Sequence, residues 1–139
     1  MKTAVVMPVG GRFCLHQPTS METVARALAR AASGDVRVFC CEGAAERGDL
    51  PVHVLPAEGR LKALRRALLD YRPDVVEFHQ QTQQAVALAP HFPDAAITLY
   101  RHNAVKPPRN PIDRWRYGAR YNRMDGLIFV SEADRKSVV

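Results

Sequence analysis

Polar residues suited to ligand binding or proton transfer follow two apolar segments of this sequence, at the points where those segments end. The run 95–100 is followed by a cation, an imidazole and an amide, which are Arg101, His102 and Asn103. A second apolar run ends at His79. Guanidinium and imidazole groups bind anions, and an imidazole also exchanges protons near neutral pH. These positions are candidates for a binding site, with His102 as the candidate catalytic residue.

Glu77 and His79 form a second candidate pair. Side chains alternate across a strand, so positions 77 and 79 share one face and could form a proton relay. No serine or cysteine nucleophile is indicated beside them, which argues against a hydrolase. For His79 and for His102, a purely structural hydrogen bond is the alternative interpretation.

Gly10 and Gly11 follow the first apolar run, 3–7. Glycines at such a point let backbone amides approach a phosphate closely. The surrounding residues match neither the G-x-G-x-x-G fingerprint of dinucleotide-binding folds nor the phosphate-binding loop G-x-x-x-x-G-K-[ST]. A dinucleotide-binding domain is therefore disfavoured, and a flexible turn remains the alternative for these glycines.

The elements that must position these residues alternate between two hydrophobic periods. Continuous apolar runs predict buried strands, and apolar positions three or four residues apart predict helices. The expected strands are 3–7, 36–41, 52–55, 74–78, 95–100 and 126–130, with helices opening near residues 19, 61, 80 and 111 between them. This alternation predicts an α/β fold, a Rossmann-like three-layer sandwich with a mostly parallel sheet of about six strands. Ligands of such sheets bind outside the carboxyl ends of the strands, which is where the candidate residues lie.

Two of the helices have specific start signals. Thr19 and Glu22 form a T-x-x-E capping box, and Asn110-Pro111 supplies an N-cap followed by a proline at the first helical position. The apolar face of this last helix is expected to consist of Ile112, Trp115 and Ala119.

The composition is that of one globular domain, with 139 residues, 47% hydrophobic and 24% charged. No apolar run approaches the roughly 20 residues that cross a bilayer, and the N-terminal residues do not read as a signal peptide. Three cysteines, Cys14, Cys40 and Cys41, show neither metal-binding spacing nor a disulfide framework. Reduced cysteines in a cytoplasmic protein are therefore expected, and no cofactor or metal is indicated.

The formal net charge of +6 is concentrated in one segment. Residues 101–123 hold seven Lys and Arg against Asp113 alone, and seven minus one equals the excess of the whole chain. Such a segment attracts phosphates, acidic glycans or anionic lipid head groups, with a solvated helix face as the alternative. Nucleic acid is not expected, because no helix-turn-helix, zinc or single-strand-binding signature is present.

The ordered motifs resemble the N-terminal domain of GT-B glycosyltransferases, most closely those of glycosyltransferase family 4. They are the Gly-Gly loop after the first strand, then RPDVVEFHQ at 72–80, TLYRHN at 98–103 and LIFVSEADR at 127–135. The resemblance covers nearly the whole chain. The sequence departs from the family pattern at Glu77, where a histidine is frequent, and at 11–22, which replaces a G-G-x-E-R-type entry to the first helix.

The resemblance implies transfer of a sugar from a nucleotide diphosphate sugar to a glycan or lipid-linked acceptor, with retention of configuration and without an obligatory metal. It implies that Gly10 and Gly11 lie near the donor phosphates and that His102 faces the reacting sugar. The cleft would also be lined by Ser131, Glu132 and Arg135. The expected substrate-binding set is completed by His79, Arg101 and Asn103.

The resemblance also implies that residues 1–139 are one domain, the acceptor-binding half, and that a C-terminal donor-binding domain is absent from this chain. The chain alone would then be inactive. The expected protein is cytoplasmic and acts in cell-envelope polysaccharide synthesis, with peripheral binding to an anionic membrane surface, at the inner face of the membrane, left open. The alternative is a stand-alone, non-catalytic Rossmann-like module that binds an anionic ligand or a partner subunit.

Overall fold

The computed structural model describes residues 1–8, 20–41, 50–102 and 108–129 of the chain. Helices and strands alternate along these residues as predicted from the hydrophobic periods. The elements are β1 (Lys2–Val6), α1 (Ser20–Ala31), β2 (Asp35–Cys41), β3 (Val52–Leu55), α2 (Arg60–Tyr71), β4 (Val75–His79), α3 (Thr82–Leu88), the 3-10 turn η1 (Ala89–His91), β5 (Ala96–Arg101), α4 (Pro111–Tyr121) and β6 (Gly126–Phe129).

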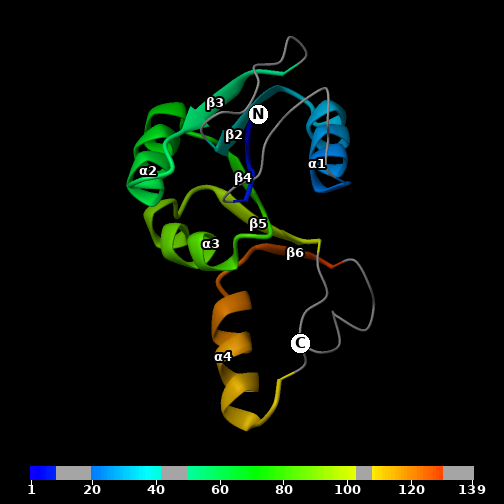
Figure 1. Ribbon diagram of the computed structural model, residues 1–139, viewed down its shortest axis with the longest axis vertical. Coiled ribbons are helices and arrows are strands. Elements are labelled where there is room, and N and C mark those ends of the chain that lie inside the picture. The colour runs from blue at the N-terminus through cyan, green and yellow to red at the C-terminus, as the bar shows by residue number, and fades with distance from the viewer. Residues whose placement is uncertain (9–19, 42–49, 103–107, 130–139) are drawn as a thin grey trace.

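The six described strands form one parallel sheet in the order β3-β2-β1-β4-β5-β6 (Figure 1). This confirms the predicted α/β fold with a Rossmann-like sandwich. The strand order runs outward from β1 to β3 and then resumes on the other side of β1 with β4. In sheets of this kind, ligands bind at the carboxyl ends of the strands near the point where the order reverses.

Two apolar clusters pack against the two faces of the sheet. α2 and α3 cover one face, where Leu64, Leu68 and Leu88 meet Val76 and Phe78 of β4 and other buried strand residues. α1 covers part of the other face, where its Ala25 and Ala29 meet Val5 of β1, Met7 just after β1, and Val38 and Cys40 of β2. Figure 1 shows α1 on one side of the sheet and α2 and α3 on the other.

The alternation along β4 decides where its polar residues point. Val76 and Phe78 belong to the cluster under α2 and α3, so Glu77 and His79 lie on the opposite face, the face that α1 partly covers. In β5, Ile97 and Leu99 belong to the same cluster as Val76 and Phe78. Thr98 and Tyr100 therefore lie on the same face as Glu77 and His79.

Helix α4 begins as the sequence predicts. The Asn110 side-chain oxygen accepts a hydrogen bond from the Asp113 N–H at 2.9 Å, and Pro111 is the first helical residue. The other predicted cap lies partly outside the described residues, since Thr19 precedes the start of α1 at Ser20. Glu22 is buried in the first turn of α1, with Oε1 3.1 Å from the guanidinium of Arg26.

The predicted apolar face of α4 is wrong. Ile112 and Trp115 are 63% and 72% exposed, and Ala119 is also exposed. Tyr117 and Tyr121 contact the core instead, and the Tyr121 ring lies edge-on to Phe129 of β6 with a 6.0 Å centroid separation. Among the described elements, the helix contacts α3 and the edge of the sheet near β6, and it does so with a narrow side that includes Tyr121.

Candidate functional site

Three of the predicted site residues, His79, Arg101 and His102, lie in the described part of the chain. The structure brings all three to the carboxyl ends of β4 and β5. The parallel register pairs His79 with Tyr100, so His102, two residues further along, lies close to His79. The other predicted site residues lie outside the described residues: Gly10, Gly11, Asn103, Ser131, Glu132 and Arg135.

The two histidines contact each other directly. His79 Nδ1 lies 2.8 Å from His102 Nε2, a hydrogen-bond distance. On its other side, His79 Nε2 lies 2.9 Å from Oε1 of Glu77. This second contact is close in distance but lacks the alignment of a hydrogen bond. The side chains of Glu77, His79 and His102 thus form a continuous row at the sheet edge, as the shared strand face of positions 77 and 79 led us to expect.

Tyr100 of β5 packs against the rings of both histidines in this row. Its ring stacks on His79 at 5.3 Å with an interplanar angle of 16°, and it lies 4.6 Å from the ring of His102. His79 is fully buried, whereas His102 is half-buried. Sequence reasoning missed Tyr100, although strand alternation alone puts positions 100 and 102 on one face. The stacking limits the ring orientations that both histidines can adopt.

Gln80 holds the backbone around the row. Its N–H donates to the Tyr100 carbonyl oxygen at 2.8 Å, and its side-chain oxygen accepts from the His102 N–H at 2.8 Å. Its φ of 68° lies in the left-handed region, which a residue with a side chain adopts only when its surroundings enforce it. No sequence signal marks this conformation, because glycine rather than glutamine is the usual residue there.

Arg101 is fixed beside the histidines. Its Nη1 donates to the Gln80 carbonyl oxygen at 3.2 Å and to Thr82 Oγ1 at 3.1 Å. Its Nε is buried and has no hydrogen-bond partner among the described residues. The guanidinium therefore supplies a positively charged group at the edge, in a defined position.

A buried cation, Arg60 at the start of α2, reaches the carboxyl end of β1 with its side chain. It is only 5% exposed, and its Nη2 donates to the Met7 carbonyl oxygen. In the sequence, Met7 is followed closely by Gly10 and Gly11, the residues suggested for phosphate binding. Sequence reasoning missed Arg60, because nothing in its neighbours separates it from the exposed basic residues of α2.

Burial sets the protonation of His102. Desolvation, followed by the neighbouring His79, lowers the pKa of His102 from the ordinary 6.5 to about 4, against an opposing effect of Glu77. His102 is therefore neutral at physiological pH. A neutral imidazole has one N–H donor and one acceptor nitrogen, so it can hydrogen-bond a hydroxyl group but carries no charge to hold an anion.

Within the described residues, no three His, Cys, Asp or Glu side chains are grouped so as to hold a metal ion. None of the described helices combines the length and apolar character that crossing a membrane requires.

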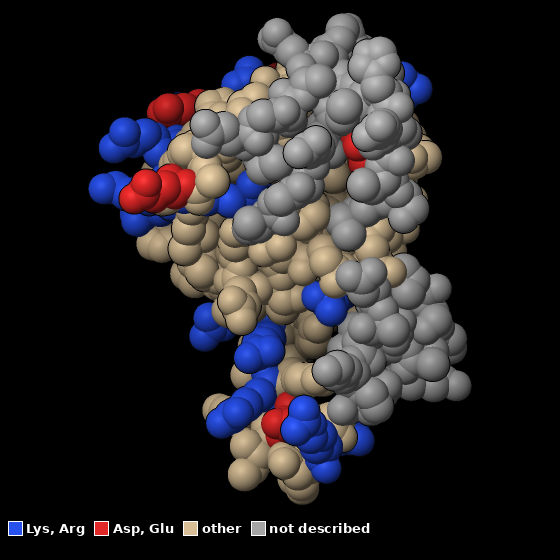
Figure 2. All heavy atoms as spheres, viewed as in Figure 1, with Lys and Arg blue, Asp and Glu red and all other residues tan. Residues whose placement is uncertain are grey.

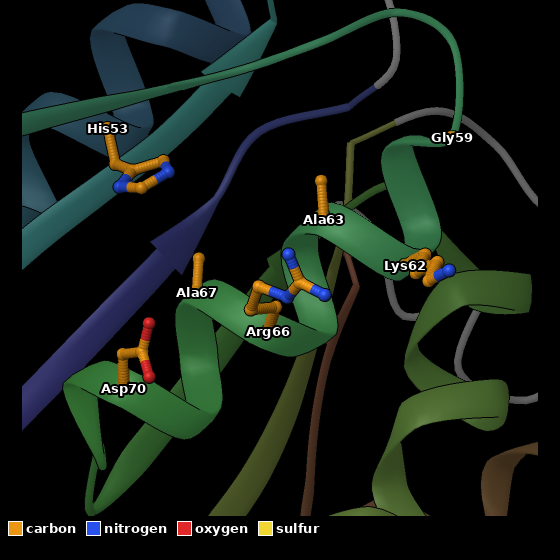
Figure 3. A pocket seen from close by; sticks show the side chains of 7 residues that line it. All are labelled: His53, Gly59, Lys62, Ala63, Arg66, Ala67 and Asp70. Carbon is orange, nitrogen blue, oxygen red and sulfur yellow. The ribbon is translucent and has the colours of Figure 1, made fainter.

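A pocket of about 370 Å³ lies away from the histidines, between β3 and α2 (Figure 3). In Figure 3 His53 enters from β3, and Ala63 and Ala67 lie along the facing side of α2. The remaining lining residues, also from α2 or its start, are Gly59, Lys62, Arg66 and Asp70. This pocket is separated from the row, because β2 and β1 lie between β3 and β4 in the sheet.

Comparison with known protein families gives a match over most of the chain. A family model described as Glycosyltransferase Family 4 matches residues 17–139. The matched range includes every described element from α1 to β6, and with them Glu77, His79 and His102. Comparisons with curated proteins and with solved structures gave no match.

Proposed function

This chain belongs to glycosyltransferase family 4, and we propose that residues 1–139 form the acceptor-binding side of a retaining enzyme. The enzyme transfers a sugar from a nucleotide diphosphate sugar to a glycan or lipid-linked acceptor. The observation that carries the proposal is the contact of His79 with His102 at the carboxyl ends of β4 and β5. The family match favours this function over a stand-alone, non-catalytic module.

His102 is the residue that faces the reacting sugar in this proposal. Its backbone N–H donates to Gln80 and its ring packs against the tilted ring of Tyr100, so its orientation is set before a ligand arrives. A polar group that is already oriented stabilises a transition state without the cost of reorganising it. His79 Nδ1 contacts His102 Nε2 and helps to hold the His102 ring in this orientation.

Cations near the edge stabilise the departing diphosphate. Arg101 lies next to His102, and Arg60 lies at the end of β1. The proposal puts Gly10 and Gly11 near the donor phosphates, where backbone amides add further hydrogen bonds. It assigns the remaining cleft contacts to Asn103, Ser131, Glu132 and Arg135.

The proposal assigns the nucleotide of the donor to a separate donor-binding domain. Stabilising a leaving diphosphate takes several positioned donors, of which this half supplies only some. Purified residues 1–139 are therefore expected not to turn over nucleotide sugars. Multiple-turnover transfer by these residues alone would contradict the division of roles between two domains.

Helix α4 suits binding to an anionic membrane surface. Ile112 and Trp115 are exposed on it, and Figure 2 shows basic side chains gathered at the end of the molecule that α4 forms. The exposed basic residues of this region are Arg109, Arg114, Arg116, Arg120 and Arg123. Basic residues with a tryptophan at an exposed helix favour the interface of an anionic bilayer. We accordingly propose a cytoplasmic enzyme, peripheral at the inner face of the membrane, that takes an acceptor of cell-envelope polysaccharide synthesis.

The test is a transfer assay with the full-length protein and a panel of nucleotide diphosphate sugars. The acceptors are short glycans and polyprenyl-linked sugars, and the configuration of the new bond is read by NMR. The proposal predicts a glycoside with the anomeric configuration of the donor sugar. Inversion of configuration would contradict the retaining mechanism, and absence of transfer across the panel would contradict the activity.

A further inference from the structure

The contacts within the row of Glu77, His79 and His102 indicate which ring nitrogen of each histidine carries a proton. Both ring nitrogens of His79 are in contact with a titratable partner, Oε1 of Glu77 on one side and Nε2 of His102 on the other. The His79 ring is fully buried, so no water replaces either partner. The protons in such a row are interdependent, because each ring nitrogen either donates or accepts.

The first proton position follows from the contact of Glu77 with His79. Glu77 Oε1 and His79 Nε2 are both buried, and within the described residues neither has a hydrogen-bond partner. They lie 2.9 Å apart. If both lacked a proton, two electron-rich atoms would lie at this distance without compensation, which is unfavourable in a buried site. A proton on His79 Nε2 removes this repulsion, because it puts a positive partial charge beside the carboxylate oxygen.

The second proton position follows from the first. A neutral His79 that carries its proton on Nε2 has only a lone pair on Nδ1. The 2.8 Å contact from His79 Nδ1 to His102 Nε2 then requires that His102 be the donor, with its proton on Nε2. His102 is neutral, since burial lowers its pKa to about 4. Its remaining nitrogen, Nδ1, therefore carries a lone pair.

We propose that Glu77 is a positioning residue that acts through His79 to fix the tautomer of His102, so that His102 Nδ1 is a hydrogen-bond acceptor. An acceptor nitrogen binds a hydroxyl or N–H group and repels a phosphate or carboxylate oxygen. His102 thus selects a hydroxyl of the ligand. That this hydroxyl belongs to a sugar rests on the proposed function, whereas the proton positions rest on the contacts of the row alone.

Proton positions can be read directly by NMR in the 139-residue chain labelled with ¹⁵N-histidine. Long-range ¹H–¹⁵N correlations distinguish a protonated ring nitrogen from a bare one, and His79→Gln and His102→Gln assign the two rings. At pH 7.5 we expect both His79 and His102 to carry their proton on Nε2. If the wild-type chain carried the His102 proton on Nδ1, that measurement alone would overturn the proposal.

Variants at position 77 test the role of the carboxylate. Glu77→Gln keeps an electron-rich oxygen beside His79 Nε2–H, so we expect the wild-type tautomers. Glu77→Leu removes the acceptor, so the His102 signals should change from a single Nε2-protonated form to a mixture of tautomers. Glu58→Leu, at an exposed carboxylate outside the row, is the control and should leave the His102 signals unchanged. Wild-type signals in Glu77→Leu would refute the role of Glu77.

A titration tests the chemical class of the ligand group. Inorganic phosphate is expected to leave the His102 Nδ1 signal unchanged, and a phosphate-dependent shift of that signal would contradict selection of a hydroxyl. These measurements use no substrate and no transfer reaction. A failed tautomer experiment therefore leaves the proposed transferase activity standing, and a failed transfer assay leaves the tautomer assignment standing.

Discussion

The Nδ1 atom of His79 lies 2.8 Å from the Nε2 atom of His102, although the two residues are 23 positions apart in the sequence. The parallel pairing of β4 with β5 creates this contact, since His79 is paired with Tyr100 and His102 follows on the same strand face. A helix crossover separates the two strands along the chain. The geometry of the site therefore depends on the sheet and on no local motif.

The lowered pKa of His102 makes folding stability depend on pH. Below pH 6.5 the unfolded chain binds a proton at His102, while the folded chain does so only near pH 4. The unfolded state then holds more protons, so the free energy of unfolding falls as the pH drops from 6.5 toward 4.

His102→Gln should reduce this pH dependence, measured by urea unfolding at pH 7, 6 and 5. His53→Gln controls for the loss of one histidine. An unchanged slope in His102→Gln would show that His102 is protonated at the same pH in both states.

The contacts of α4 can be separated from its exposed side by two substitutions. Tyr121 is buried against Phe129, so Tyr121→Ala should lower the free energy of unfolding by about 3 kcal/mol. Trp115 is 72% exposed, so Trp115→Ala should change it by no more than about 0.5 kcal/mol. Urea unfolding of both variants measures the difference. A larger loss of unfolding free energy in Trp115→Ala would support the apolar face that the sequence suggested.

Membrane binding through α4 is tested with liposomes of phosphatidylglycerol and phosphatidylcholine. Replacing Arg114, Arg116 and Arg120 with glutamine should weaken co-sedimentation roughly a hundredfold, because each basic residue near an anionic surface contributes about 1 kcal/mol. Binding of the wild-type chain should also weaken with added salt.

The matched control replaces three exposed basic residues of α2 with glutamine, namely Lys62, Arg65 and Arg66. It lowers the net charge by the same amount on another surface. Equal loss of binding in both triple variants would mean that net charge alone attracts the chain, and α4 would then have no special role.

The fold was predictable because its signals are local and consistent along the chain. Apolar runs gave the strands of a buried parallel sheet, and the Asn110-Pro111 pair gave the start of α4. The apolar face of α4 was not predictable, since Trp115 and Tyr121 are both aromatic and only the position of β6 decides which one is buried. Periodicity identifies an apolar residue but not the element that covers it.

The site was predictable in part, for a related reason. His79 and His102 could be placed at strand ends, and strand alternation put Glu77 beside His79. Their contact with each other, the stacking of Tyr100 and the left-handed backbone of Gln80 depend on the register of β4 against β5. Register comes from packing across the whole sheet, which spacing along one strand does not reveal.

The most direct test of the proposed function is the turnover of the full-length enzyme with His102→Ala, measured together with its thermal stability. If His102 contacts the reacting sugar, kcat should fall by about 10²–10³, the usual scale for one polar group acting at the transition state. The melting temperature should fall by only about 5 °C, because the His102 ring is half-buried and lies outside both apolar clusters, and the main cost is the partner that His79 Nδ1 loses. Near-normal turnover with a large loss of stability would contradict the account and would make His102 a structural hydrogen-bonding residue.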